Sequence, residues 1–394
     1  MKEGWTYKKL DDICTIVGRI GFRGYTKADL VNSSKDGAIT LSPSNIIDGE
    51  LDFSKCTYIN WDKYYESPEI MLENGDIVLV KTASIGKCAV VKNLPHEATL
   101  NPQFVVLKQL VGVPDFICYY LKSPIAQNTI KQMAGGVAIP TLSQKKLGMM
   151  IVPTPSQNEQ QSIVDYLDSA FAKIDAMKAN AEKALNEAKA LFQASLKEML
   201  EPKEGWEEKF LKDIAEYSIG LTYKPTNVCD DGTIVLRSSN IQEGKLDLND
   251  IVRVNASIKE DLYVRSGDIL MCSRNGSARL VGKVCIIPEL EERMTYGTFM
   301  MVIRSAYNPL LYHYFDTGLF RSQIKHGEAN MINQITRYML DEVKLNLPPI
   351  SEQESIVTTL NSLKSKVDRL QENFDKISQE CDALKQAILR QVFE

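Results

Sequence analysis

"PSQNEQQSIVDYLD" occupies residues 155–168, and a second version of it, "PISEQESIVTTLN", occupies residues 349–361. Both versions follow an apolar run of the kind that forms a strand, and both contain Glu-Gln and then Ser-Ile-Val. Each leads into a long periodic segment. A junction written twice, almost two hundred residues apart, indicates that the chain repeats a larger unit.

Four further pairs of short sequence motifs, called words below, repeat in the same order. Gly-Trp followed by Leu-x-x-Ile opens both halves, at residues 4–13 and 205–214. "SPSNIIDGELD" (42–52) matches "RSSNIQEGKLD" (237–247), "NGDIVLV" (74–80) matches "SGDILMC" (266–272), and "IGKCAVV" (85–91) matches "VGKVCII" (281–287). The offsets stay between 192 and 201, so the chain is a tandem duplication of a globular module followed by a tail.

Each module has the sequence pattern of an α+β fold. Short β-branched and apolar runs separated by Gly, Asn and Ser predict strands at 77–80, 88–91 and 104–107, with counterparts at 269–272, 284–287 and 299–303. A helical hairpin is predicted over 114–133 and again over 308–327, with Ser123-Pro124 as a helix start. The expected boundaries are 1–155 for the first module, 156–203 for a central helix, 204–350 for the second module and 351–394 for a C-terminal helix.

The two tails carry a heptad pattern. Apolar residues of the second tail are spaced 4-3-4-3 for about four and a half heptads, which is typical of a coiled coil. We expect Ser351 with Glu354, and Asn158 with Gln161, to cap the two helix starts. Antiparallel pairing of the tails would relate the modules by a pseudo-two-fold axis. The residues predicted to pair the helices are Leu167, Phe171, Ile174, Leu185, Leu360, Leu363, Val367, Leu370, Phe374, Ile377, Leu384 and Ile388.

The composition is that of an ordinary globular protein. Of the 394 residues, 44% are hydrophobic and 25% charged, and no apolar run approaches the ~18 residues of a membrane span. The first residues, "MKEGWTYKKLDD", are too polar for a secretory signal peptide. Eight scattered cysteines and three histidines indicate neither a zinc site nor a disulfide framework, so a cytoplasmic location is expected.

The repeated words resemble those of the specificity subunit of Type I restriction–modification enzymes, and the resemblance covers the whole chain. It implies two strand-rich target recognition domains that each read one half of a split site in double-stranded DNA. It also implies two conserved helices that separate the domains and dock two modification (methyltransferase) subunits, with restriction subunits added for cleavage. S-adenosylmethionine and ATP would then be bound by those partners, with no cofactor, metal or catalytic site on this chain. Because the modules differ between their shared words, the expected target is asymmetric and bipartite.

Base readout needs polar side chains on exposed loops, and three loops of each module supply them. Each of these residues could instead be a solvated cation or a turn residue. Arg274 and Arg279 are the strongest single candidates, as guanine readers or phosphate clamps. The first module contributes Arg19, Arg23, Tyr25, Lys27, Lys81, Thr82, Ser84, Lys87, Thr141, Ser143, Gln144, Lys145 and Lys146. The second module contributes Tyr223, Lys224, Arg274, Asn275, Ser277, Arg279, Lys283, Asn330, Asn333, Gln334 and Arg337.

Three observations weigh against a lone DNA-binding protein, an adenine methyltransferase and a nucleotide-binding protein. The formal net charge of −5 is unusual for a lone DNA binder, so local basic loops or partner proteins must supply the phosphate contacts. Asn101-Pro102-Gln103-Phe104 lacks the second proline of an adenine methyltransferase motif and is better explained as a strand start. A phosphate-binding loop needs Gly-x-x-x-x-Gly-Lys-Ser/Thr, which Gly86-Lys87 and Gly282-Lys283 do not complete. The alternatives left open are a dimeric coiled-coil adaptor without sequence-specific DNA binding, and a fused methyltransferase or nuclease.

Overall fold

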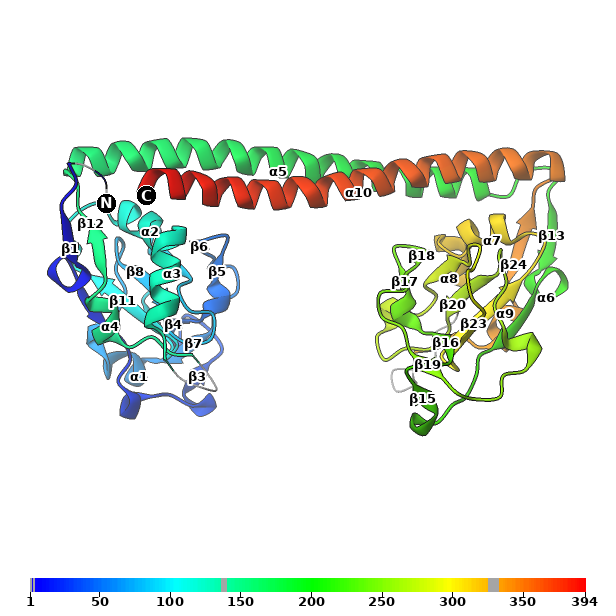
Figure 1. Ribbon diagram of the computed structural model, residues 1–394, viewed down its shortest axis with the longest axis horizontal. Coiled ribbons are helices and arrows are strands. Elements are labelled where there is room, and N and C mark those ends of the chain that lie inside the picture. The colour runs from blue at the N-terminus through cyan, green and yellow to red at the C-terminus, as the bar shows by residue number, and fades with distance from the viewer. Residues whose placement is uncertain (1, 3, 136–139, 325–332) are drawn as a thin grey trace. The chain divides into compact units, whose positions relative to one another are not determined.

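The structure is a computed structural model that describes residues 2, 4–135, 140–324 and 333–394. It divides into two compact units, Met1–Ala181 with Asp375–Glu394, and Glu182–Phe374. Each unit contains one module and one end of both long helices, α5 and α10 (Figure 1). The units therefore cut across the helices, because each helix end packs into the core of the module beside it.

The first module begins and ends with paired strands. Its strands are β1 (Tyr7–Lys9), β2 (Thr15–Val17), β3 (Leu30–Val31), β4 (Gly37–Leu41), β5 (Ile46–Ile47), β6 (Glu50–Leu51), β7 (Tyr58–Asn60), β8 (Ile77–Val80), β9 (Cys88–Val90), β10 (Ala98–Leu100), β11 (Phe104–Lys108) and β12 (Ile151–Pro153). Its helices are α1 (Trp61–Tyr65), α2 (Pro114–Lys122), α3 (Pro124–Met133) and α4 (Gln144–Gly148), and α5 (Gln157–Leu200) follows.

The second module has the same order of strands, but a short helix follows its first strand and a 3-10 turn lies between the counterparts of β7 and β8, where the first module has α1. Its strands are β13 (Glu207–Phe210), β14 (Glu216–Ile219), β15 (Val228–Cys229), β16 (Thr233–Leu236), β17 (Ile241–Gln242), β18 (Lys245–Leu246), β19 (Arg253–Val254), β20 (Ile269–Cys272), β21 (Val284–Ile286), β22 (Met294–Tyr296), β23 (Met300–Arg304) and β24 (Lys344–Leu347). Its helices are α6 (Leu211–Ile214), α7 (Asn308–Tyr314), α8 (Gly318–Gln323) and α9 (Arg337–Asp341), and α10 (Ile350–Phe393) follows.

The sheets of the two modules have identical topology, which confirms the duplication and the α+β class. An antiparallel sheet has the order β2-β11-β8-β9 in the first module and β14-β23-β20-β21 in the second. A mixed sheet has the order β10-β4-β7-β3 and, in the same sense, β22-β16-β19-β15. Terminal strands pair antiparallel, β1 with β12 and β13 with β24, so the first and last residues of each module meet.

The central strand of each antiparallel sheet is buried on both faces. In β8, Ile77 and Leu79 join a core with the helices, while Val78 and Val80 join a second core between the sheets. Residues 269–272 of β20 alternate between the corresponding pair of cores. Side chains alternate between faces along a strand, so a continuous apolar run is what a central strand covered on both sides requires.

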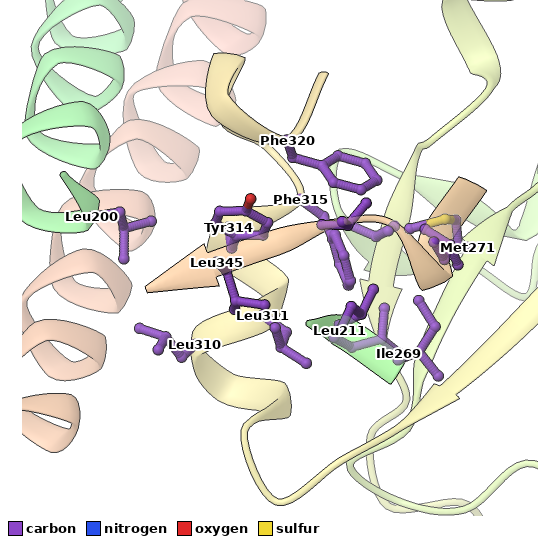
Figure 2. Close-up of a cluster of buried hydrophobic side chains, with 14 of the residues drawn as sticks. Leu200, Leu211, Ile269, Met271, Leu310, Leu311, Tyr314, Phe315, Phe320 and Leu345 are labelled. Atoms are coloured by element: carbon purple, nitrogen blue, oxygen red, sulfur yellow. The ribbon is translucent and has the colours of Figure 1, made fainter. Parts of the chain in front are cut away.

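The core beside the helices in the second unit is shown in Figure 2. Side chains of α7 and of the antiparallel sheet meet Leu200 from the end of α5 in one cluster. Phe315 and Phe320, on either side of the α7–α8 turn, pack edge to face with their ring centroids 4.8 Å apart. The hairpin thus holds the sheet against the long helices.

Helices α5 and α10 pack antiparallel within both units. In the first unit, Asp175 pairs with Lys385 at 2.5 Å and Lys178 with Asp382 at 3.7 Å, so the partner number falls as the residue number rises. In the second unit, the Lys189 Nζ donates to the Gln371 side chain at 2.7 Å. Because these contacts join two helices of one chain, the tails pair within the molecule.

Most residues predicted to pair the helices are turned away from solvent. Those that are buried are Leu167, Ile174, Leu185, Leu360 and Val367, and those that are half-buried are Phe171, Leu363, Leu370, Phe374, Ile377 and Ile388. Leu384 departs from the prediction, because its side chain is 47% exposed. At this end α10 packs on the first module through Leu389 and Phe393, and the ring of Phe393 meets that of Phe116 at 5.5 Å. The buried face of the helix therefore rotates away from Leu384.

The repeated junction and the repeated Gly-Trp are bonded to each other. The Trp5 Nε1 donates to Glu159 at 2.7 Å, and the Trp206 Nε1 donates to Glu352 at 3.3 Å. Next to these, the side chains of Gln160 and Gln353 donate to a proline carbonyl five residues earlier, at 2.9 and 2.8 Å. The junction is thus repeated because each module is closed by contacts between its first word and the first turn of its helix.

The predicted helix caps are wrong. The cap of α5 is Ser156, whose Oγ accepts from the amide of Glu159 at 3.3 Å, and Asn158 already lies inside the helix. Helix α10 begins at Ile350, and the carbonyl of Pro349 accepts from the amide of Gln353 at 3.1 Å. Ser351 is therefore in the first turn and cannot be its cap. The hairpin helix α3 does begin as predicted, with Ser123 capping at Ala126.

Candidate nucleic-acid interface

The second and third candidate loops of the first module are in direct contact. They are the β8–β9 loop and the segment before α4, and Thr82 forms a β-bridge with Thr141 where they meet. The amide of Leu142 donates to the carbonyl of Lys81 at 2.8 Å. Ser143 caps α4 by accepting from the amide of Lys146 at 3.2 Å, which fixes the helix that carries Gln144 and Lys145.

The same two loops meet in the second module through equivalent bonds. Arg274 forms a β-bridge with Gln334, and the amide of Ile335 donates to the carbonyl of Ser273 at 2.7 Å. The amide of Asn275 donates to the carbonyl of Asn333 at 3.2 Å. Two polar segments that are about sixty residues apart therefore form one surface in each module.

A third segment joins this surface, and sequence reasoning treated it only as a strand start. It is the turn before β11, where the carbonyl of Gln103 accepts from the amide of Lys81 at 2.8 Å. In the second module the carbonyl of Phe299 accepts from the amides of Ser273 and Arg274, at 2.9 and 3.1 Å. The predicted strand start is confirmed at Phe104, whereas the second strand begins at Met300, one residue after its predicted start. The signal that could have revealed its second role is Phe299, an aromatic residue directly after a Gly-Thr turn.

The repeated word at 42–52 also borders the surface. The Lys87 Nζ donates to the carbonyl of Pro43 at 3.3 Å, and the Asn275 side chain donates to the Ser238 hydroxyl at 3.2 Å. Within each word, Asn45 and Asn240 donate to two carbonyls of the following turn, at distances of 2.8–3.2 Å. The motif is therefore repeated because its asparagine holds a turn that supports the variable side chains of the surface.

The first candidate loop needs a correction at Arg19. Its side chain is 5% exposed and donates to the carbonyls of Leu100 and Arg23 and to the hydroxyl of Thr99. Its guanidinium lies over the ring of Tyr25, whose hydroxyl accepts from Thr40 at 3.2 Å. A buried guanidinium with these partners supports the loop from inside, so Arg19 is structural and does not face a ligand.

Other residues of the first loop are placed at the surface. Arg23 forms an ion pair with Glu69 at 3.5 Å, Lys27 and Lys224 are exposed, and Tyr223 is half-buried. The loop also approaches α4, since a Cβ added at Gly18 would lie 2.6 Å from the Gln144 side-chain nitrogen. A larger residue would displace the Gln144 side chain, so glycine at this position lets the first loop lie at the edge of the surface formed by the other two.

The cations of the surface are held in different ways. Lys81 is half-buried, and burial lowers the pKa of its amine from the ordinary value. Within the described part of the chain its Nζ has no hydrogen bond or ion pair, so the amine is available to an anion. Arg274 lies over the ring of Phe299, with the guanidinium carbon 5.4 Å from the ring centroid, and Arg279 is exposed. Lys283 reaches the Gln242 side chain at 3.5 Å.

The remaining candidates lie on the same loops. Ser84, Ser277 and Arg337 are exposed, and Asn333 and Gln334 are half-buried. Asn330 lies outside the described residues, as do 136–139 of the third loop. Among the residues that the structure does describe, no group of three His, Cys, Asp or Glu side chains could hold a metal ion. None of the described helices is long and apolar enough to cross a membrane.

Comparison with known proteins assigns the two halves to the same family model. The model described as "Type I restriction modification DNA specificity domain" matches residues 2–187 and again residues 203–379. The chain is 24% identical to the Type I restriction enzyme EcoKI specificity subunit of Escherichia coli (strain K12), over all of this chain and 89% of that protein. It is 21% identical to the StySPI specificity subunit of Salmonella potsdam, with the same coverage.

Solved structures share the fold. One chain, described under "Structural basis underlying complex assembly and conformational transition of the type I R-M system", aligns with a TM-score of 0.74 and 18% identity. The alignment covers 100% of this chain and 98% of that one. The HsdS subunit from Thermoanaerobacter tengcongensis aligns with a TM-score of 0.52 and 18% identity, over 99% of this chain and 97% of that subunit.

Proposed function

The chain belongs to the Type I restriction modification DNA specificity family, and from this premise we propose that each of its modules reads one half of an asymmetric, bipartite DNA site. In this function the chain supplies base recognition, and partner subunits supply the chemistry. The loops described above then form the reading surface of each module.

The observation that carries the proposal is that one scaffold presents two different sets of side chains. Both modules join the same three segments by equivalent backbone hydrogen bonds. The side chains at the joined positions differ, because Lys81, Thr82, Gln103 and Thr141 in the first module correspond to Ser273, Arg274, Phe299 and Gln334 in the second. Bases are distinguished by side-chain donors, acceptors and apolar groups, so unlike surfaces imply unlike half-sites.

Two modification subunits would dock on the long helices. Large apolar side chains of α5 that point away from the helix pair are available for this contact, namely Tyr166, Met177 and Leu191, which are 54%, 58% and 63% exposed. The net charge of −5 supports such an assembly, since a complex can gain from its partners the phosphate contacts that an acidic chain lacks. S-adenosylmethionine and, for cleavage, ATP would be bound by the modification and restriction subunits.

The adaptor alternative required the tails to pair between chains. The contacts of Asp175 with Lys385 and of Lys189 with Gln371 are made within one chain, and they favour the reader. The remaining enzymatic alternative predicts methyl transfer by the purified chain alone.

Single-molecule methylation mapping tests the proposal. DNA is isolated from cells that express this chain with its modification subunits, and modified adenines are located base by base. The expected result is a pair of unlike half-sites separated by an unspecified gap. A continuous motif, a palindromic motif or methylation without regard to sequence would contradict the proposal.

A single substitution locates the reading surface. Arg274→Ala in the assembled modification complex should weaken binding to the mapped site by about 1–3 kcal/mol if the guanidinium reads a base. The matched control is Arg293→Ala, an exposed arginine of the same module that contacts Glu260 and Tyr263 instead of the loops. Equal affinities for the two variants in a titration of labelled DNA would remove Arg274 from the interface.

A further inference from the structure

Phe299 is an exposed aromatic side chain within the second module's reading surface, next to Arg274. Its side chain is 56% exposed, whereas the neighbouring Met300 and Met301 are fully buried in the two cores. The ring lies beside the guanidinium of Arg274, 5.4 Å away. More than half of the ring is in contact with water, so most of its apolar area does not contribute to the core and remains available to a ligand.

The backbone of Phe299 is held by several bonds, and none of them involves its ring. Its carbonyl accepts from the amide of Ser273, the amide of Arg274 and the hydroxyl of Ser273, at 2.9, 3.1 and 3.0 Å. These bonds fix where the side chain leaves the surface. An exposed side chain on a fixed backbone is the arrangement that a recognition contact needs, since little conformational entropy is lost when a ligand binds.

The first module has an amide at the same position. Gln103 precedes β11 as Phe299 precedes β23, and its carbonyl accepts from the amide of Lys81 in the same way. The Gln103 side-chain oxygen accepts from the Asn101 side chain at 3.1 Å, and its amide nitrogen remains a donor. One position of a common scaffold therefore carries a hydrogen-bonding group in one module and a purely apolar ring in the other.

The two side chains select different base edges. A phenylalanine ring can contact the 5-methyl group of thymine in the major groove, whereas a glutamine amide can form paired hydrogen bonds with adenine. We propose that Phe299 is a specificity-determining residue of the second module, which selects thymine at one position of its half-site by contact with the 5-methyl group. Gln103 is the equivalent polar reader in the first module. This inference rests on the proposed function and adds the identity of one contact.

Replacement of thymine by uracil tests the contact, because it removes only the methyl group. In the assembled modification complex, affinity is measured for the mapped site with each thymine of both half-sites and both strands replaced in turn. One replacement should weaken wild-type binding about fourfold, as expected for burying one methyl group. Phe299→Ala should bind the thymine and uracil forms of that position equally, while Phe299→Leu should keep part of the preference.

Gln103→Ala is the matched control, since it alters the equivalent position and should leave this thymine preference unchanged. Thermal unfolding of each variant checks that the fold is intact. The inference is overturned if no thymine shows a methyl preference, or if Phe299→Ala keeps the wild-type ratio. An equal factor of loss on the thymine and uracil DNAs, relative to the wild-type complex, would mean that the ring acts in another way, for example by insertion between base pairs. Failure of the proposed function would look different, because the wild-type complex would then not distinguish the mapped site from unrelated DNA.

Discussion

The two modules share one backbone fold and differ in the side chains that make equivalent contacts. The contact between the hairpin and the long helix shows this most clearly. In the first unit Tyr119 donates to Asp168, and in the second His313 lies 2.8 Å from the Asn361 side chain at the corresponding place. The geometry is kept while the chemistry changes, so a duplicated fold is defined by which positions touch and tolerates different ways of satisfying the contact.

A second difference lies near the short hairpins β5–β6 and β17–β18. The Lys122 Nζ donates to the carbonyl of Gly49 at 2.8 Å, and in the other unit the Tyr312 hydroxyl donates to the carbonyl of Gly244 at 3.2 Å. Both glycines have a positive φ, 83° and 77°, which other residues adopt at a cost. The turn is kept by glycine in both units, and the donor that holds it comes from a different residue type.

The largest effect is expected from Phe320→Ala, which gives the second module the residue found at the equivalent position, Ala126, of the first. Phe320 is 1% exposed and packs on Phe315, so the substitution leaves a cavity. The second unit should lose about 3–5 kcal/mol of stability. Hydrogen exchange of the β20 and β23 amides measures the loss, with the β8 and β11 amides as the internal control. A loss below about 1 kcal/mol would mean that the two cores are interchangeable.

Arg304→Lys tests whether two ion pairs are equivalent. Arg304 donates to Asp268 at 2.9 Å and also to the carbonyls of Tyr263 and Asp261. In the first module Lys108 holds Asp76 at 2.7 Å with one further bond to a carbonyl. Lysine cannot reproduce the planar fork, so the substitution should cost the second unit about 2 kcal/mol.

Hydrogen exchange in β20 and β23 also reports this change. The reciprocal substitution Lys108→Arg is the control and should not stabilise the first unit, because Lys108 already bonds to Asp76 and to the carbonyl of Met71. Unchanged exchange in the Arg304→Lys variant would show that the extra bonds contribute nothing.

The smallest effect is a difference in pH dependence. Burial lowers the pKa of His313 below its ordinary value of 6.5, although the hydrogen bond with Asn361 opposes the shift. The unfolded chain therefore binds a proton more readily than the folded one. His313 therefore leaves the stability of the second unit unchanged above pH ~6.5. Below that value it lowers the stability, by at most about 1.4 kcal/mol per pH unit.

The first unit should lack this loss, since burial and the contact with Asp168 raise the pKa of Tyr119, which stays neutral over the same range. Exchange rates at pH 7 and pH 5, corrected for intrinsic rates, compare the two units in one sample. His313→Gln should remove the difference. If the variant keeps the full pH dependence of the second unit, another group is responsible.

Several features could be predicted from residues alone because they depend on local patterns. The apolar runs at 77–80 and 269–272 predicted strands, and the 4-3 spacing of the tails predicted two long helices. The helix start at Ser123 followed from a serine before a proline. The caps of α5 and α10 could not be predicted in the same way, because several polar residues compete near each start. The Ser156 hydroxyl caps α5, whereas the carbonyl of Pro349 accepts from amides in the first turn of α10.

The reading surface depended more strongly on tertiary contacts. Sequence reasoning selected loops by polarity, which brought in Arg19, a residue whose guanidinium is used inside the module. The same criterion left out Phe299, because an apolar side chain gives no signal of exposure. A charged residue can be buried when carbonyls are placed around it, and an aromatic residue can be exposed when its backbone is held elsewhere. Neither condition is visible along the chain.

The sequence by itself determined the duplication, three strands and the helical hairpin of each module, and the two heptad tails, since repeated motifs and periodic spacing are properties of the linear chain. Only the tertiary structure decided why the words repeat, by bonding Trp5 to Glu159 and Trp206 to Glu352. It also decided which loops share a surface. The physical reason is that hydrogen bonds and burial depend on distances between residues that are remote in sequence, and folding alone sets those distances.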